Sequence, residues 1–444
     1  MNAGIWSGSL LRMAGMSPEY SYSGGRNVIR VELPKKRMNP ILKILIFVAI
    51  GILLGVIGLN VLTDPARVFL CIYLLGPLQE IWIRILTVIS GPVIFLMILA
   101  TILNTGAIAE QGGDSRLSLV RYFLFSFLAG LVTIIPASWI FGMGQDWAPP
   151  RNEALESFMI VLTHFIPMDL FESISTADAP QLLVIALVVG NALLVIGQPA
   201  SGLTSILRQS GSLAQKLSEW ISLLVPYFTA ALIFLEILRG QTSMLIGLWK
   251  VLLISLVISA GLVFLTGVVT SLRMEVPLGL LWRKIRKPFI TAIRAGSVEA
   301  SFGTTEKSCV QELGIEEHFT KVSLPHGIVL YMPVNLVGIM CFLGYASVQL
   351  DVHISAFGFF MAMLFAVMLF VATPPVPGAN LLAYMALFLE FDISGDTLVD
   401  AMLFDVVFST FAAAGNQAML QMELLLQSGR LGLLNRDILL KEPK

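Results

Sequence analysis

The sequence predicts an all-α polytopic membrane protein, and three observations support this prediction. Of the 444 residues, 56% are hydrophobic and 13% are charged, whereas an average soluble domain carries about 25% charged residues. The mean hydropathy is +0.85. Apolar runs long enough to cross the roughly 30 Å hydrocarbon core of a bilayer recur along the chain. Together these features place the protein in a cell membrane, in contact with lipid over much of its surface.

Eight apolar segments are long enough to form transmembrane helices, and the fourth contains a break. They lie near residues 41–62, 78–104, 118–143, 157–198, 212–238, 244–272, 319–346 and 397–425. The first is too long for a signal-peptide core and lacks a small-residue cleavage site, so no cleavable signal is expected. The polar residues 1–40 and 429–444 are expected to be cytoplasmic tails, because the N-terminal tail is rich in Lys and Arg.

Basic residues orient the predicted helices, because loops rich in Lys and Arg remain on the cytoplasmic side. Counting spans from the N-terminal tail places the following residues on that side: Arg116, Arg121, Arg208, Lys216 and the connector Arg273–Arg294. The C-terminal tail falls there as well. All loops agree with this scheme only if the apolar segment Ile354–Leu389 enters and leaves the membrane on the outer face.

The segment Ile354–Leu389 carries no charge and contains three prolines within Ala372–Asn380. As one helix it would be roughly 54 Å long, far more than a bilayer requires. Proline removes backbone donors and breaks helices, so two arms are predicted, near Ala356–Val371 and Gly378–Leu389. Irregular backbone at membrane depth is tolerated only where it is buried in protein or lines a cavity. Broken segments of this kind point to the binding site of a transporter.

A second irregular segment, Thr291–Ile315, follows the basic connector and contains small and polar residues at Gly296–Thr305. An ordinary amphipathic cytoplasmic helix is one reading of this stretch. The other reading is an inner re-entrant hairpin, which would pair with the outer hairpin at Ile354–Leu389. An inner and an outer hairpin, each followed by a span, form an inverted repeat.

The last predicted helix carries Asp405, Ser409, Ala412 and Asn416 at offsets that place them on one face. Polar and ionisable residues within membrane helices usually face the bundle interior and are functional by default. We therefore assign these four residues to a substrate site. The alternative is that Asp405 is hydrated near the outer surface and Asn416 only joins two helices.

Further candidates lie at the predicted breaks. Pro333 interrupts the seventh helix, so Asn335 and Tyr331 are expected to line the break, although Tyr331 could equally be a packing residue. At the inner tip, Ser297 and Glu299 are candidates. Glu299 would favour a cation, or couple to protons if desolvation raises its pKa. The alternative is that Glu299 reaches cytoplasmic water or pairs with an arginine.

At the outer tip, Pro377, Gly378 and Asn380 precede the second arm, whose first N–H groups are able to hold an anion. His326 is predicted to be a satisfied buried histidine rather than a proton carrier. The combined candidates for cation coupling are Tyr331, Asn335, Asn416 and Glu299, and the identity of any metal stays unknown.

Other classes of function lack sequence support. The chain has no GxGxxG, P-loop or HExxH pattern, so neither ATP-driven transport nor enzymatic activity with a resident cofactor is indicated. Cys71, Cys309 and Cys341 are too far apart for a metal motif or a disulfide framework. A net charge of −1 gives no indication of nucleic-acid binding.

The order of these features resembles the dicarboxylate/amino-acid:cation symporter family of the glutamate-transporter type. The similarity rests on Gly91–Phe95, Ile166–Glu172, Arg286–Ala292, Glu312–Ile315, Leu324–Gly327 and Val376–Ala379. It implies eight transmembrane helices, two re-entrant hairpins, elevator-type movement and a homotrimer. Residues 41–240 would then be mainly scaffold, with helix 3 in the moving part. Residues 241–428 would form the transport domain, with hairpins near 291–315 and 354–389.

Several positions depart from what the family carries. Ser409 stands where the family has an aspartate for the substrate's amino group, and Ala412 stands where members that prefer acidic substrates have an arginine. Leu420 replaces a sodium-ligating aspartate, and Tyr331–Asn335 replaces the family's Asn-Met-Asp-Gly-Thr run. Sodium prefers hard oxygen ligands, so the usual sodium cage should be weakened. The bidentate fork for a second carboxylate is also missing.

The sequence thus predicts a symporter for a small polar organic solute, such as an amino acid or a dicarboxylate. The coupling cation is sodium by resemblance, or a proton because the usual acidic ligands are absent. The alternative is a degenerate, non-transporting homologue that acts as a membrane scaffold, a sensor or an anion-leak pore.

Overall fold

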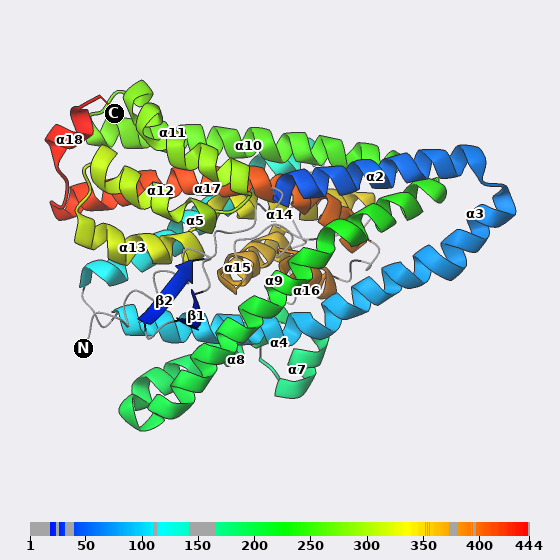
Figure 1. The fold of residues 1–444 in the computed structure, drawn as a ribbon, viewed down its shortest axis with the longest axis horizontal. Coiled ribbons are helices and arrows are strands. Elements are labelled where there is room, and N and C mark those ends of the chain that lie inside the picture. Colours follow the sequence, from blue (N-terminus) through cyan, green and yellow to red (C-terminus); the bar gives the residue numbers. More distant parts are fainter. Residues whose placement is uncertain are drawn as a thin grey trace, which may run out of the picture.

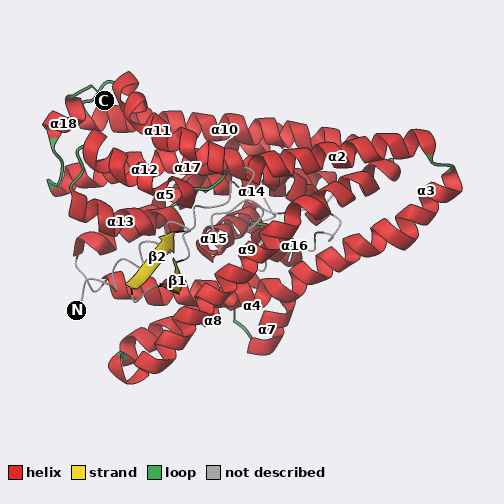
Figure 2. Ribbon diagram, viewed as in Figure 1, coloured by secondary structure: helices red, strands yellow, loops and turns green. Residues whose placement is uncertain are grey.

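The computed structural model describes most of the chain, and nearly all of this part is helical (Figures 1 and 2). The described residues are 18–23, 26–31, 40–109, 113–141, 166–240, 242–350, 352, 354, 356–372, 380–391, 393 and 397–442. Within them, β1 (Pro18–Ser23) and β2 (Arg26–Val31) form an antiparallel hairpin. These strands lie in the predicted N-terminal tail, for which no regular structure was expected.

The first half of the chain folds into long helices that follow the predicted apolar segments. They are α2 (Pro40–Val61), α3 (Asp64–Leu70), a π-helical turn η1 (Cys71–Leu75), α4 (Gly76–Ala109), α5 (Gly113–Phe141), α7 (Leu170–Thr176), α8 (Ala179–Ile196), η2 (Gln198–Ala200), α9 (Ser201–Leu238) and α10 (Thr242–Met274). In Figure 1, α2 runs outward to α3, where the chain turns back into α4. The break predicted within 157–198 corresponds to the turn between α7 and α8.

The second half contains the predicted hairpins and the last two spans. Its elements are α11 (Leu278–Ala295), η3 (Glu299–Ser301), α12 (Phe302–Lys307), η4 (Ser308–Glu312), α13 (Glu317–Leu330), α14 (Pro333–Gln349), α15 (Ala356–Ala372), α16 (Leu381–Glu390), α17 (Thr397–Leu431) and α18 (Arg436–Leu440). Among the described residues, six helical segments are long and apolar enough to cross a membrane.

Most of the basic connector predicted at Arg273–Arg294 forms the helix α11. The helix is strongly amphipathic: Leu281, Ile285 and Ala292 are buried, whereas the arginines and lysines around them are mostly exposed. An apolar stripe at this spacing stabilises a helix through tertiary packing. Gly296, at φ 65°, ends α11 in the left-handed conformation. The inner hairpin therefore has α11 as its first arm and η3, α12 and η4 as its second.

The outer hairpin has the two arms predicted from the prolines. The helix α15 ends at Ala372 and α16 begins at Leu381, and the two pack against each other. The tip itself, residues 373–379, lies outside the described residues. With 17 and 10 residues, the arms are about 25 Å and 15 Å long at 1.5 Å per residue, so neither crosses a bilayer alone.

The helices pack in two groups. In one, α9 contacts α2 and α4, and α8 contacts α4; in the other, α17 contacts α10, α11 and α14, and α5 contacts α13 and α14. The outer hairpin touches both groups, because α15 contacts α4 as well as α14. Although α5 lies early in the sequence, it therefore packs with the second half of the chain.

The close packing of α2 against α9 depends on small residues, as is common in membrane bundles. Gly51, Gly55 and Gly58 lie on one face of α2 toward α9. A Cβ added at Gly51 would lie 2.6 Å from the carbonyl oxygen of Ala230, and one at Gly55 would lie 2.7 Å from Ile237 side-chain atoms. The backbones therefore approach more closely than larger residues would permit.

Gly51→Ala should lower the stability of the protein, because the new methyl group meets backbone rather than a movable side chain. Overpacking of this kind costs about 1–3 kcal/mol. Thermal unfolding in detergent would measure the effect. Gly261→Ala on α10, where nothing lies within 4 Å of the added Cβ, is the matched control and should not lower the midpoint. Equal midpoints for the two variants would contradict the packing argument.

Candidate functional site

The break predicted in the seventh span is present between α13 and α14. Tyr331 and Met332 leave the helical conformation, with ψ of 87° and 52°. Pro333 has no backbone N–H, and the N–H of Val334 donates to the side-chain oxygen of Asn416 at 2.8 Å. A side chain of α17 thus replaces a helical hydrogen bond that the break removes. Such replacement is required at membrane depth, where no water is available.

Four side chains from three elements form a continuous chain of hydrogen bonds, called here the asparagine network. Asn416 Nδ2 donates to Asn335 Oδ1 at 2.7 Å, and Asn335 Nδ2 lies 3.5 Å from Asn380 Oδ1. Asn380 Nδ2 in turn donates to Asp405 Oδ1 at 2.9 Å. The network joins α17, the start of α14 and the start of α16, which is the second arm of the outer hairpin. All four residues were named from the sequence.

The asparagine network is buried in the bundle. Asp405 is 1% exposed, Asn416 is 2% exposed and Asn380 is 5% exposed, while Asn335 is half-buried. Asp405 is therefore shielded from surface water, in contrast to the hydrated position considered from the sequence. Keeping four polar side chains buried is costly unless they bond with one another or with a ligand.

Ser409 and Ala412 lie on the same face of α17 as Asp405 and Asn416, and both are buried. Among the described residues, the Ser409 hydroxyl has no hydrogen-bond partner. Buried polar groups nearly always have a partner, so such an exception requires an explanation. A hydroxyl one helical turn from Asp405 is suitably placed to bind a polar group of a ligand.

The structure does not bring every predicted site residue to the asparagine network. Ser297 accepts a hydrogen bond from the backbone N–H of Ala300 at 3.3 Å and so caps the inner turn. Glu299 belongs to η3, but its side chain lies outside the described residues, as do Pro377 and Gly378. Their roles stay predictions.

Tyr331 and His326 both make local contacts within the bundle. The Tyr331 ring is buried and lies 5.6 Å from the ring of Tyr122 on α5. His326 is half-buried, and its Nδ1 lies 2.5 Å from the carbonyl oxygen of Val322 one turn earlier. The predicted hydrogen-bond partner of His326 is therefore present, although its side chain is half-buried rather than buried.

An ion pair between α5 and α17 was missed. Arg121 Nε lies 2.5 Å from Glu423 Oε1, and the two side chains are 8% and 2% exposed. Gln427 also donates to Glu423 at 2.8 Å. The sequence predicts Arg121 on the cytoplasmic side of the apolar segment 118–143; in the structure it lies on α5 inside the bundle, where Glu423 compensates its charge. A basic residue in the apolar segment 118–143 and an acidic residue near the end of 397–425 were the available signal.

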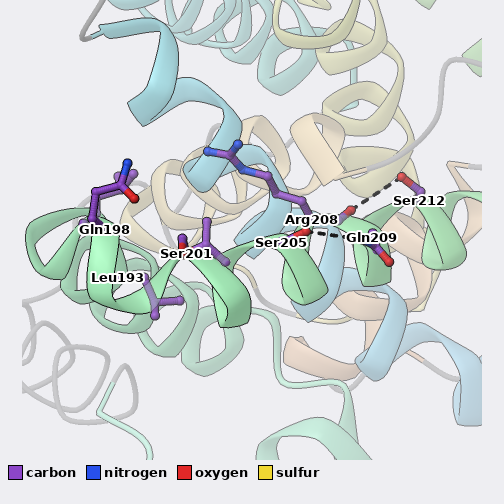
Figure 3. Close-up of a pocket in the computed structure, with 10 residues that line it drawn as sticks. Leu193, Gln198, Ser201, Ser205, Arg208, Gln209 and Ser212 are labelled. Carbon is purple, nitrogen blue, oxygen red and sulfur yellow. Dashed lines mark hydrogen bonds between the residues drawn. The ribbon is translucent and has the colours of Figure 1, made fainter. Parts of the chain in front are cut away.

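An open cleft in the first helix group is not part of this site. It encloses about 610 Å³ and is lined by residues of α8, η2 and α9, several of which Figure 3 shows: Leu193, Gln198, Ser201, Ser205, Arg208, Gln209 and Ser212. Arg208 donates to the carbonyl oxygen of Leu103 at 2.9 Å. Among the described residues, no group of three His, Cys, Asp or Glu side chains is arranged to hold a metal ion.

Two broken helical elements and a buried polar network between them are typical of secondary transporters. The model of the sodium:dicarboxylate symporter family matches residues 41–419. The chain therefore belongs to this family, which confirms the resemblance seen in the sequence and identifies it as a membrane transporter rather than an enzyme.

Two relatives illustrate the range of the family. The chain is 25% identical over 309 residues to the serine/threonine transporter SstT of Streptococcus suis, covering 67% of this chain and 80% of that protein. It is 27% identical over 178 residues to the C4-dicarboxylate transport protein of Sinorhizobium medicae, covering 37% of each. One relative is thus named for amino acids and the other for dicarboxylates.

Asn416→Leu should lower the stability of the protein, because the Val334 N–H and Asn335 both lose a buried partner. Each unsatisfied buried group costs about 1–3 kcal/mol. Thermal unfolding in detergent would measure the loss. Asn191→Leu on α8 is the matched control, since Asn191 is exposed and donates only to its own helix at Leu187. A midpoint for Asn416→Leu as high as that of the control would argue against the network.

Arg121→Gln should destabilise the protein strongly, because it leaves the Glu423 carboxylate buried without its cation. Breaking one side of a buried pair costs about 3–5 kcal/mol, whereas removing both charges is often nearly neutral. The double variant Arg121→Gln with Glu423→Gln should therefore recover most of the loss. A double-mutant cycle on thermal midpoints measures this coupling. Additive losses in the double variant would show that the two charges do not interact.

Proposed function

We propose that the protein is a secondary active transporter for a small polar organic solute, and that the asparagine network is part of its solute site. The observation that supports this most is the position of Asp405. Its carboxylate is buried on α17 and is bonded to the outer hairpin through Asn380. It lies one turn from Ser409, whose hydroxyl has no hydrogen-bond partner among the described residues. The candidate solutes are amino acids and dicarboxylates, the two classes for which the relatives are named.

Within these classes, the charges of the site favour a zwitterionic amino acid over a dicarboxylate. Asp405 is the only charged residue of the asparagine network, and a carboxylate favours a cationic group such as an ammonium. The solute's single carboxylate would be held by N–H groups at the start of α16. A second carboxylate would need a cation, and Ala412 supplies none. The longer similarity to a transporter named for serine and threonine supports the same choice.

We further propose that transport proceeds by an elevator movement. The two helix groups support a division into a mainly scaffold part, residues 41–240, and a transport domain, residues 241–428. Helix 3, which is α5, belongs to the transport part, because it packs on α13 and α14. The proposal also includes eight transmembrane helices and two re-entrant hairpins that are related as inverted repeats. It further includes cytoplasmic termini, a cell-membrane location and a homotrimer.

The coupling cation in this proposal is sodium or a proton. Tyr331, Asn335, Asn416 and Glu299 are the candidate residues. Asn335 and Asn416 offer neutral oxygens at the helix break, which suit sodium poorly without acidic partners. A proton carried by Glu299 is the alternative. The family's members and the retained buried network favour transport over the non-transporting scaffold, sensor or leak pore.

Reconstituted protein should accumulate L-serine, L-threonine or L-alanine in liposomes when a sodium or pH gradient is imposed, and should favour these over succinate. Asp405→Asn should raise the apparent KM roughly 10- to 100-fold, because a hydrogen bond to a charged group is worth about 1.5–3 kcal/mol. Glu219→Gln is the control, since Glu219 is on α9 and pairs with Lys216 of the same helix. Radiolabelled uptake measures both.

The same assay separates the parts of the proposal. Uptake of no tested solute under any gradient would rule out the transporter function. Better uptake of succinate than of the amino acids would contradict the charge argument at Asp405. If the coupling ion is a proton carried by Glu299, then Glu299→Gln abolishes uptake driven by pH, and uptake that persists unchanged eliminates that residue.

A further inference from the structure

The second arm of the inner hairpin is joined to α17 by side-chain hydrogen bonds. Ser301, Thr305 and Ser308 follow one another at offsets of four and three residues, so they share one face of the arm. Opposite them, α17 presents Gln417 and Gln421, which are one turn apart and fully buried. We call these five residues the amide ladder.

Each glutamine of the amide ladder contacts the hairpin. Ser301 Oγ donates to Gln417 Oε1 at 3.0 Å, and Gln417 Nε2 donates to Thr305 Oγ1 at 2.6 Å. Ser308 Oγ lies 3.0 Å from Gln421 Oε1, and Gln421 Nε2 donates to the carbonyl oxygen of Gln417 at 3.2 Å. The tip and the arm of the hairpin are thus bonded to the helix that carries the asparagine network.

The base of the hairpin is anchored in a different way, by the C-terminal segment 432–442. Asn435 N donates to the carbonyl oxygen of Gly314 at 2.8 Å, and Glu316 N donates to that of Leu433 at 3.0 Å. The buried ammonium group of Lys284 donates to the carbonyl oxygens of Glu312 and Ile438, at 2.6 and 2.9 Å. In Figure 1, α18 lies at the same end of the molecule as α11. The first two bonds join the main chains of two segments, and the Lys284 side chain adds a third connection.

The amide ladder can open without leaving the hydroxyl groups of the hairpin unpaired. Ser301 Oγ also lies 2.7 Å from the carbonyl oxygen of Val298, and Thr305 Oγ1 donates to that of Ser301 at 2.8 Å. Ser308 Oγ lies 3.1 Å from the carbonyl oxygen of Lys284. Each hydroxyl therefore keeps an acceptor within its own hairpin. Only the glutamine amides would need water when the hairpin separates from α17.

We propose that Gln417 and Gln421 form a latch that closes the inner hairpin against α17, and that the hairpin pivots about its anchored base when the solute site opens inward. The opening of the site rests on the proposed function, whereas the latch itself is a property of the fold. Gln417 directly follows Asn416, which holds the helix break. One turn of α17 therefore carries both the latch and a residue of the solute site. Gln417 and Gln421 are positioning residues, which act through the hairpin.

Cysteine labelling at two depths of the hairpin tests the latch. Val298→Cys, at a buried position beside the tip, is one reporter; native Cys309 in η4, near the base, is the other. Each is used alone, with Cys71→Ser, Cys341→Ala and, for the tip reporter, Cys309→Ala. Gln417→Leu should increase the rate of maleimide labelling at the tip roughly ten-fold, because buried hydrogen bonds are lost. The labelling rate of Cys309 should change by less than about two-fold.

Two further variants keep this test decisive. Thr305→Val removes one bond of the ladder from the hairpin side and should also increase labelling at the tip. Gln427→Leu, whose amide donates to Glu423 within α17, is the control and should change neither reporter. An unchanged rate at the tip, or equal increases at tip and base, would overturn the proposal. The assay needs no solute, so a tip-specific increase supports the latch even in a protein that fails to transport.

Discussion

The hydrogen bond from the Val334 N–H to Asn416 is the interaction on which the candidate site depends. A helix that breaks inside a membrane leaves backbone groups that water cannot reach, so the protein must supply their partners. Here Pro333 breaks the seventh span. The Asn416 side chain of α17 accepts a hydrogen bond from the Val334 N–H that the break leaves free, and it also donates to Asn335. The break is thereby tied to the last helix, and Asn380 and Asp405 extend the same bonding to the outer hairpin.

Helix α17 is consequently the central element of the second helix group. One face carries Asp405, Ser409 and Asn416 toward the broken helix and the outer hairpin. An adjacent face carries Gln417 and Gln421 toward the inner hairpin. Further along, Glu423 pairs with Arg121 of α5. These contacts join both hairpins, the broken helix and α5 to one long helix. This arrangement is compatible with the proposed elevator movement of the group as a unit.

The sequence was sufficient for those features that depend on local chemistry. The arms of the outer hairpin followed from prolines in a charge-free segment, and the break at Tyr331–Met332 followed from Pro333; the structure confirms both. Asp405 and Asn416 were named because polar side chains stand out in an apolar helix, whereas Asn335 and Asn380 were named for their places beside the helix break and the outer tip. The helical form of the connector Arg273–Arg294 was not evident, because its many charges obscured the apolar stripe of α11. The pairing of Arg121 was not evident either, since its partner Glu423 is distant in the chain.

The amide ladder could not have been found in the same way. Gln417 and Gln421 have no distinctive spacing relative to Ser301 or Thr305, and only the packing of the inner hairpin on α17 brings them together. Pairings between segments so far apart are set by the tertiary fold, which local patterns do not specify. The family resemblance did not reveal these glutamines, because it drew attention only to positions at the family's solute and cation sites.

The central claim is that the solute binds at the asparagine network, between α17, the helix break and the outer hairpin. An experimental structure of the protein saturated with L-serine or L-threonine tests this most directly. The account predicts density for the solute within hydrogen-bonding distance of Asp405 and Ser409, with its carboxylate toward the start of α16. Density confined to the cleft between α8 and α9, or an empty site in a protein shown to bind the solute, would contradict it.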